Sequence, residues 1–330
     1  GSEKNTLPPY TPTPLLRRAG DSYGGIILRP DRWEMENEEE LRTERVIRKV
    51  NPNLGVTIQP DYYAREWEQA ERDPSYKKEV ITKLYNIFAS DRAVDWITSD
   101  EIRPLQVDMT ANEGWAVLSG LDFTNVGDDL QALSFLAVRA RKDGKGREFF
   151  ADLRAWITEE TVMNSPIKNV LLDWASRGYL NIVKSKVLSP NMPVDEIVRL
   201  RNMGVNIMGF GYDPFRANEP INLIKDWIVG FGVKPSDLAN YVMPVGQKFG
   251  NMTPLIDEMT YMVRCEQPMI RFSNSPLWPW EFNNCQLIES VDGMENKKVV
   301  KTRPEMKVDN VQALLDALFV YDTMNGKVVK

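Results

Sequence analysis

The sequence predicts an α/β protein, in which helices flank a mixed β-sheet and a mostly helical segment precedes it. Two observations support this fold class. Three strand-like segments follow one another from about residue 115, and helices then alternate with strands up to a last helix near residue 309. Consecutive strands form antiparallel hairpins, whereas strands separated by helices pair in parallel, so the two patterns together predict a mixed sheet.

The three consecutive strands are predicted over 115–123, 130–141 and 147–157, where apolar residues dominate. Between the second and third, the sequence RKDGKGRE supplies glycines for a tight hairpin. The alternating part begins with a short strand near 180–184 and the helix VDEIVRLRNMG, which Gly204 ends. The later predicted elements are the strand VNIMGFGYDP, the helix EPINLIKDWIVGFG, the strand NYVMPVG, the helix TPLIDEMTYMVRC, the short strand MIRF and the helix VDNVQALLDALFVYD.

The N-terminal third of the chain has a different composition. Residues 1–30 are rich in Pro, Gly and Thr and are expected to be extended, and the charged residues 31–49 are expected to form a solvated helix. Helices are predicted to start near Asp61 and at Asp73–Pro74. We therefore predict a charged linker over 1–45, a helical connecting segment over 46–111 and the α/β domain over 112–330.

Composition excludes several kinds of active site. The chain has no histidine, which removes histidine-based triads and histidine metal sites. Any metal must therefore have oxygen ligands, which favours Mg²⁺, Mn²⁺ or Ca²⁺. The two cysteines are too few for a disulfide framework. No apolar run reaches the roughly 20 residues of a membrane span, and the net charge of −6 does not exclude a local basic surface.

Three aspartates fall at the ends of predicted elements. Asp122 lies in the first apolar strand, Asp213 follows the strand NIMGFGY, and Asp309 begins the last helix. The order of elements matches the ribonuclease H-like fold, in which these three places meet. Carboxylates so close would repel one another strongly unless divalent cations bound between them. Each aspartate also has a structural explanation, since Asp309 suits a helix N-cap and Asp213 precedes a proline turn.

The same segments resemble the nuclease part of the large terminase subunit of tailed bacteriophages. The resemblance is carried by GLDFTNVGDDLQALSFL, by DWASRGYLNIVKSKVLSPNMPVDEIVRL, by NIMGFGYDPFRAN and by KVVKTRPEMKVDNVQALLDAL. A fifth segment, NPNLGVTIQPDYYAREWEQAERDPSYKKEVITKLYNIF, resembles the helical connection that precedes this nuclease. Together they cover roughly residues 46–322.

The resemblance implies that Asp122, Asp213 and Asp309 are catalytic acids binding two Mg²⁺ or Mn²⁺ ions, with Asp128 or Asp129 as a weaker ligand. It implies an endonuclease that cuts concatemeric phage DNA in the host cytoplasm, with double-stranded DNA, the portal protein and the small terminase subunit as partners. The basic segment KKVVKTRPEMK and the hairpin are the best candidates for contacts with phosphate, although either could be a solvated edge. Their candidate DNA-binding residues are Lys297, Lys298, Lys301, Arg303, Lys307, Arg141 and Lys142.

One departure from the family pattern concerns the motor ATPase of a complete large terminase. No phosphate-binding loop of the form GxxxxGK[ST] occurs here, and the opening Gly-Ser suggests a tag scar on a fragment from which the motor was removed. Two alternatives stay open at this point. One is another ribonuclease H-like nuclease, such as a resolvase or transposase, and the other is a non-catalytic scaffold that docks on a portal.

Overall fold

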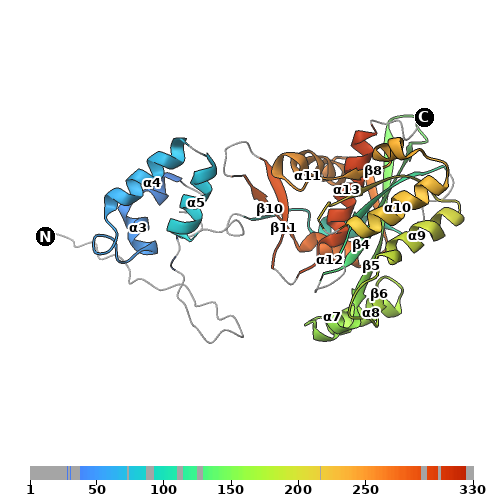
Figure 1. The fold of residues 1–330 in the computed structure, drawn as a ribbon, viewed down its shortest axis with the longest axis horizontal. Coiled ribbons are helices and arrows are strands. Elements are labelled where there is room, and N and C mark those ends of the chain that lie inside the picture. Colours follow the sequence, from blue (N-terminus) through green and yellow to red (C-terminus); the bar gives the residue numbers. More distant parts are fainter. Residues whose placement is uncertain are drawn as a thin grey trace. The chain divides into compact units, whose positions relative to one another are not determined.

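The computed structural model describes residues 28, 30, 38–72, 74–86, 93–109, 114–124, 129–215, 217–290, 296–303 and 306–324. The chain forms two compact units, Gly1–Asp91 and Arg92–Lys330, which are described separately (Figure 1). Residues 93–109 belong to the second unit, in which the ring of Trp96 lies 5.7 Å from that of Phe282. The sequence boundary expected at 111/112 falls in residues 110–113, outside the described part, and the three-part division of the chain stays a prediction.

The described part of the first unit is helical, as the sequence predicts. Its aromatic core includes the buried side chains of Trp67 and Tyr85. The indole N–H of Trp67 donates a hydrogen bond to the phenol oxygen of Tyr85 over 2.7 Å. Over residues 38–50 the chain forms two short helices with Leu41 and Val46 buried, so this stretch is not the solvated helix expected; residues 31–37 lie outside the described part. The helices are α2 (Glu38–Leu41), α3 (Glu44–Val50), α4 (Pro60–Arg72) and α5 (Pro74–Tyr85).

The second unit is built on a mixed sheet that, in the described residues, has eight strands in the order β2-β9-β5-β4-β3-β7-β8, with β6 added to β5. The pairs β3–β4 and β4–β5 are antiparallel, whereas β3–β7, β7–β8 and β5–β9 are parallel. This order confirms the predicted mixed sheet. The strands are β2 (Gln106–Val107), β3 (Ala116–Asp122), β4 (Gln131–Ala140), β5 (Arg147–Thr158), β6 (Asn181–Val183), β7 (Asn206–Tyr212), β8 (Val242–Pro244) and β9 (Ile270–Ser273).

A small antiparallel sheet of β1 (Val94–Asp95), β10 (Cys285–Glu289) and β11 (Lys297–Lys301) lies beside the main one in the same unit (Figure 1). The helices include the two one-turn elements α6 (Ser99–Ile102) and η2 (Arg103–Leu105). The others are α7 (Glu159–Asn164), α8 (Lys168–Ser176), α9 (Asn191–Asn202), α10 (Asn218–Gly230), η3 (Pro235–Asn240), α11 (Phe249–Arg264), α12 (Leu277–Asn283) and α13 (Asp309–Thr323).

The main sheet has an apolar layer on each face, because side chains alternate along every strand. One layer joins α9 and α10 to Val117 and Leu121 of β3, and the other joins α11, α12 and α13 to Ala116 and Leu118. Among the described helices none is long and apolar enough to cross a lipid bilayer.

Helix α13 lies directly against the middle of the sheet, and glycines make this approach possible. A Cβ atom on Gly120 of β3 would lie 1.7 Å from the carbonyl oxygen of Ala313, and one on Gly211 of β7 would lie 2.2 Å from that of Asp316. Both positions therefore require glycine. The contacts fix the height of α13 over the two strands, and with it the position of every polar side chain on its sheet-facing side.

Candidate active site

Asp122 and Asp213 lie at the ends of neighbouring parallel strands. The pairing of β3 with β7 ends at Leu121 and Tyr212, so the two aspartates are the next residues on each strand. Neighbouring strands are about 4.8 Å apart. Because Asp122 shares its face with Gly120, its side chain is on the α13 side of the sheet. The sequence places Asp122 within its strand, whereas in the structure it is the last strand residue and is only partly buried.

Asp309 is the first residue of α13 and lies level with these strand ends. Ala313 contacts Gly120, and four helical residues back from Ala313 span about 6 Å. Two strand residues on from Gly120 to Asp122 span about 6.6 Å, so the helix and the strand reach the same height. Burial raises the pKa of Asp309 to about 6, and the ammonium of Lys301 opposes that rise.

A fourth carboxylate, Asp316, belongs to the same cluster. It lies seven residues after Asp309, two turns further along the same face of α13, and is fully buried. Its carboxylate accepts the backbone N–H of Asp213 and the side-chain amide of Gln247, the latter over 3.2 Å. Burial, the larger influence, and the charge of Asp213 raise the pKa of Asp316 well above its ordinary value.

The pKa of Asp122 responds to both its burial and the charges of its neighbours. Burial raises its pKa well above the ordinary value, and three neighbouring carboxylates raise it further, in the order Asp309, Asp316 and Asp213. In the described part of the chain no hydrogen bond or ion pair joins the Asp122 carboxylate to another residue. Asp122 therefore lies among the carboxylates of Asp309, Asp316 and Asp213, near the carboxyl ends of β3 and β7.

Two lysines border this group on one side. Lys301 Nζ, at the end of β11, is 3.8 Å from Asp309 Oδ1 and also donates to Asp129 Oδ1. Lys307 donates to the same Asp129 oxygen over 3.3 Å. Burial alone would raise the pKa of Asp129, but these two ammonium groups lower it below its ordinary value. Asp129 thus anchors both lysines beside the acids.

Glu281 of α12 fixes the start of α13. Its carboxylate accepts the backbone N–H of Asn310 over 2.7 Å and the Asn310 side-chain amide over 2.6 Å. Val308 precedes the helix without a side-chain cap, so Glu281 satisfies amides that the helix leaves unpaired. Burial raises the pKa of Glu281 to about 8, and the nearby charge of Asp309 adds to the rise. This packing holds the first turn of α13, and therefore Asp309, in place.

The chemistry of these donors suits a hard divalent cation. Asp309 Oδ2 and Asp316 Oδ2 are buried and have no hydrogen-bond partner within the described ranges. Buried oxygens of this kind are costly unless a cation or proton meets them, and carboxylate oxygens are the ligands that Mg²⁺ prefers. Among the described residues, however, no three acidic or cysteine side chains converge closely enough to hold one ion. The carboxylate oxygens are thus suitable ligands for a hard divalent cation, but no three of the described acids lie close enough together to bind one ion.

The family model of the terminase large subunit endonuclease domain matches residues 32–324 of this chain. The chain belongs to that family. This terminase domain is 22% identical over 311 residues to protein YmfN of Escherichia coli K12, across 90% of the chain and 63% of YmfN. It therefore spans less than two thirds of that relative's length.

One solved structure supports the fold of the terminase domain. The crystal structure of the HK97 bacteriophage large terminase superimposes with a TM-score of 0.62 at 19% identity, over 84% of this chain and 54% of the HK97 chain. The crystal structure of the large terminase nuclease from thermophilic phage G20c matches at 12% identity over 66% of this chain and 94% of its own, with a TM-score of only 0.36. The family model confirms the family expected from the sequence, and the HK97 superposition confirms the ribonuclease H-like fold.

Of the acids predicted for the terminase site, Asp213 and Asp309 lie near enough to Asp122 to raise its pKa, and the catalytic role of the three stays a prediction. Asp128 lies outside the described residues. Asp129 is present at the edge of the group, where it pairs with lysines. Asp316 is absent from the sequence prediction, although it is a single carboxylate within the apolar helix VQALLDALF, two turns after Asp309, just as Asp122 is a single carboxylate in an apolar strand.

The predicted DNA-binding residues of the terminase domain differ in their surroundings. Lys301 and Lys307 both pair with Asp129 beside the candidate acids, and Lys297 pairs with Asp257 over 3.0 Å. Arg303 and Lys142 are exposed, while Lys298 and Arg141 are half-buried, with Arg141 3.3 Å from Asp143. Their contact with DNA stays a prediction.

Proposed function

We propose that this terminase domain is an endonuclease that hydrolyses DNA phosphodiesters with two Mg²⁺ or Mn²⁺ ions. One observation supports this most directly. Helix α13 lies on the glycines of β3 and β7, and its carboxylates are brought to the strand ends beside Asp122 and Asp213. The raised pKa of Asp122, caused by burial and then by the neighbouring carboxylates, is the electrostatic signature of a site that favours added positive charge.

In this proposal Asp122, Asp213 and Asp309 hold the ions, and Asp316 positions the Asp213 backbone through its N–H bond. Bound divalent cations would supply Lewis-acid activation of water and of the phosphodiester. Lys301, 3.8 Å from Asp309, would neutralise a phosphate oxygen that reaches the acids. Asp129 keeps that ammonium and the one of Lys307 beside the site. Contacts made mainly to phosphate give little sequence preference and strong salt dependence.

The larger role follows from the family. We infer that the full-length protein cuts concatemeric phage DNA during genome packaging in the host cytoplasm. Its partners there would be double-stranded DNA, the portal protein and the small terminase subunit. The competing hypothesis is a non-catalytic scaffold that docks on a portal, for which the acids would have no chemical task.

The test is cleavage of supercoiled plasmid in Mn²⁺, with and without EDTA. We predict nicking that EDTA abolishes and that Asp122→Asn reduces more than about 100-fold, since even residues that only support metal ligands cost 10- to 100-fold. Asp226→Asn is the matched control, because Asp226 is an exposed aspartate of α10 on the other face of the sheet.

Two results would contradict the proposal. One is Asp122→Asn retaining the activity of the Asp226 control. The other is wild-type protein giving no EDTA-sensitive nicking at any Mn²⁺ concentration, which would favour the scaffold. Circular dichroism and the melting temperature of Asp122→Asn establish that a loss of cleavage is not a loss of fold.

A further inference from the structure

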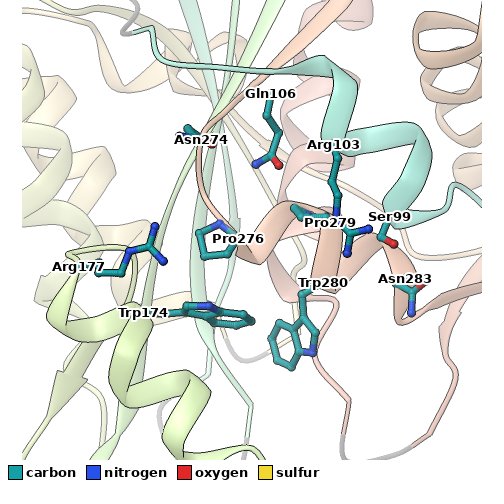
Figure 2. A pocket seen from close by; sticks show the side chains of 10 residues that line it. All are labelled: Ser99, Arg103, Gln106, Trp174, Arg177, Asn274, Pro276, Pro279, Trp280 and Asn283. Atoms are coloured by element: carbon teal, nitrogen blue, oxygen red, sulfur yellow. The ribbon is translucent and has the colours of Figure 1, made fainter.

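A cavity of about 420 Å³ opens in the second unit, apart from the acids. It lies between α6 and η2, helix α8 and helix α12, as Figure 2 shows. Its volume is within the range of about 300–1,000 Å³ that is usual for small-molecule sites. The side chains that line it are Ser99, Arg103, Gln106, Trp174, Arg177, Asn274, Pro276, Pro279, Trp280 and Asn283.

Two indole rings give the cavity its apolar surface. The rings of Trp174 and Trp280 meet edge to face, with centroids 5.3 Å apart and planes at 68°. Both side chains are half-buried, so each keeps part of its surface open to the cavity. Neither indole N–H donates to another residue in the described part of the chain. Flat aromatic faces of this kind stack on nucleobases, and stacking is worth about 1–3 kcal/mol per base.

The charged groups of the cavity are all positive. Its lining contains Arg103 and Arg177 and no acidic residue, and in Figure 2 the two guanidinium groups lie on opposite sides of the opening. Arg103 contacts Asp100 over 2.8 Å, and Arg177 contacts Asp173 over 3.5 Å, both in exposed pairs. A guanidinium has five N–H donors, so one carboxylate contact leaves others for an anion.

Amide groups complete the lining. The side-chain amide nitrogen of Gln106 donates to the carbonyl oxygens of Ser273 and Ser275 over 3.2 and 2.8 Å, which fixes its orientation. The exposed amides of Asn274 and Asn283 make no hydrogen bond within the described ranges. Each presents a donor and an acceptor side by side, the pairing that recognises the edge of a base.

We propose that this cavity binds one unpaired nucleotide of single-stranded DNA. The base stacks on an indole face, the amides contact its edge, and an arginine binds the phosphate. An acidic peptide would match the arginines but leaves the paired flat rings and free amide edges unexplained. The choice of DNA as the source of the nucleotide rests on the proposed nuclease function. Helix α12 links the two sites, since it carries Trp280 in the cavity and Glu281 at the start of α13.

The test measures binding of a fluorescein-labelled single-stranded ten-nucleotide DNA to the whole chain by anisotropy, in EDTA. We expect Trp280→Leu to weaken binding about 5- to 150-fold, from the loss of one stacked base. Arg177→Gln should weaken it several-fold through a lost phosphate contact. The control is Arg201→Gln: both arginines are exposed and lie over an aromatic ring, Tyr179 for Arg177 and Phe231 for Arg201, but Arg201 is outside the cavity.

A second measurement keeps the proposal testable if Trp280→Leu does not fold. The chain has nine tryptophans, so its indole N–H groups give few NMR signals. Addition of the ten-nucleotide DNA should shift the signals of Trp174 and Trp280, assigned with single Trp→Phe variants, and leave the others in place. Signals that shift elsewhere, or that respond to a poly-glutamate peptide and not to DNA, would overturn the proposal.

A blunt-ended duplex separates this site from general DNA attraction. Its affinity should be the same for wild type and Arg177→Gln, because all of its nucleotides are paired. An equal loss for both DNAs would show a general basic surface and no nucleotide site. All binding is measured without metal, so failure of the cleavage test for Asp122 does not affect this result, and failure here leaves the cleavage test intact.

Discussion

At the scale of single residues, the candidate site is defined by carboxylates placed where the fold would otherwise prefer apolar groups. Asp316 is fully buried in an apolar helix, with Oδ2 lacking a partner in the described residues. Burying such a group costs several kcal/mol unless something compensates. Its other oxygen accepts hydrogen bonds from Gln247 and from the Asp213 backbone. Asp316 therefore helps to hold Asp213 in place, although its own burial is costly.

Asp316→Asn should therefore change metal affinity and stability in opposite directions. We expect Mn²⁺ binding about 10- to 100-fold weaker, the usual effect of losing a residue that supports metal ligands. The metal-free protein should melt at a higher temperature, because asparagine avoids the cost that burial and the charge of Asp213 impose on the acid. Isothermal titration with Mn²⁺ and thermal melting in EDTA measure the two effects, with Asp226→Asn as control. Unchanged Mn²⁺ affinity would remove Asp316 from the site.

At the scale of elements, the candidate site depends on how closely α13 approaches β3 and β7. The helix backbone touches the strands at Gly120 and Gly211, with no side chain between them. Helix–sheet packing normally separates the backbones by intervening side chains, so this contact brings α13 closer to the sheet than usual. From this contact, four helical residues back to Asp309 and two strand residues on to Asp122 cover nearly the same distance, so the two aspartates lie at the same level.

Gly120→Ala should destabilise the second unit by about 3 kcal/mol or more, since its methyl group would meet the Ala313 carbonyl at 1.7 Å and backbone must move. Gly230→Ala is the control: it ends α10, has no atom within 4 Å of the added Cβ, and should be neutral or slightly stabilising. Urea unfolding measures both. Equal stabilities of the two variants would mean that α13 does not lie this close to β3.

A second element contact predicts an acid-dependent stability. Glu101 of α6 binds Arg264 at the end of α11 over 2.6 Å, and this bond lowers the pKa of Glu101 to about 2. The folded pKa is below the unfolded value of about 4.5, so the contribution is complete above pH 4.5 and is lost as the pH falls toward 2. The pair is partly exposed, so we expect less than about 1 kcal/mol.

Glu101→Gln isolates this charge, because glutamine can keep the hydrogen bond that Glu101 accepts from the Thr98 backbone. The variant should be less stable than wild type at pH 6, and the difference should shrink as the pH approaches 2. Urea unfolding at several pH values, combined with Arg264→Gln in a double-mutant cycle, measures the pair. A difference that stays constant with pH would contradict the ion pair.

At the scale of the whole molecule, the proposal places every functional group in one of the two compact units. All four acids, both lysines beside them and the nucleotide cavity belong to the unit Arg92–Lys330. The first unit has its own aromatic core around Trp67 and Tyr85. Domains with their own cores fold independently as a rule.

The fragment 92–330 should therefore fold alone and nick plasmid in Mn²⁺ at a rate within about threefold of the whole chain, since every proposed catalytic group is retained. Circular dichroism, a cooperative urea transition and the plasmid assay check this. A fragment that folds but loses nicking would place part of the active site in residues 1–91.

The sequence alone predicted the fold class, the strand order of the first hairpins and three of the four acids of the candidate site, and its resemblance to a known family implied the family. The fold class and the candidate acids follow from local patterns: apolar runs along 115–157, the glycines of the hairpin, and aspartates in or next to predicted elements. Such signals depend on neighbours in the chain, which the sequence lists directly.

Only the tertiary structure decided the rest. Four contacts join residues far apart in the chain. They are the contact of α13 with Gly120, the hydrogen bond from the Asp213 backbone to Asp316, the pairing of Lys301 and Lys307 with Asp129, and the packing of Trp174 on Trp280. Each depends on which side chains the packing of helices on the sheet brings within contact distance. No periodicity in the sequence records that choice, because it is made by close packing across elements.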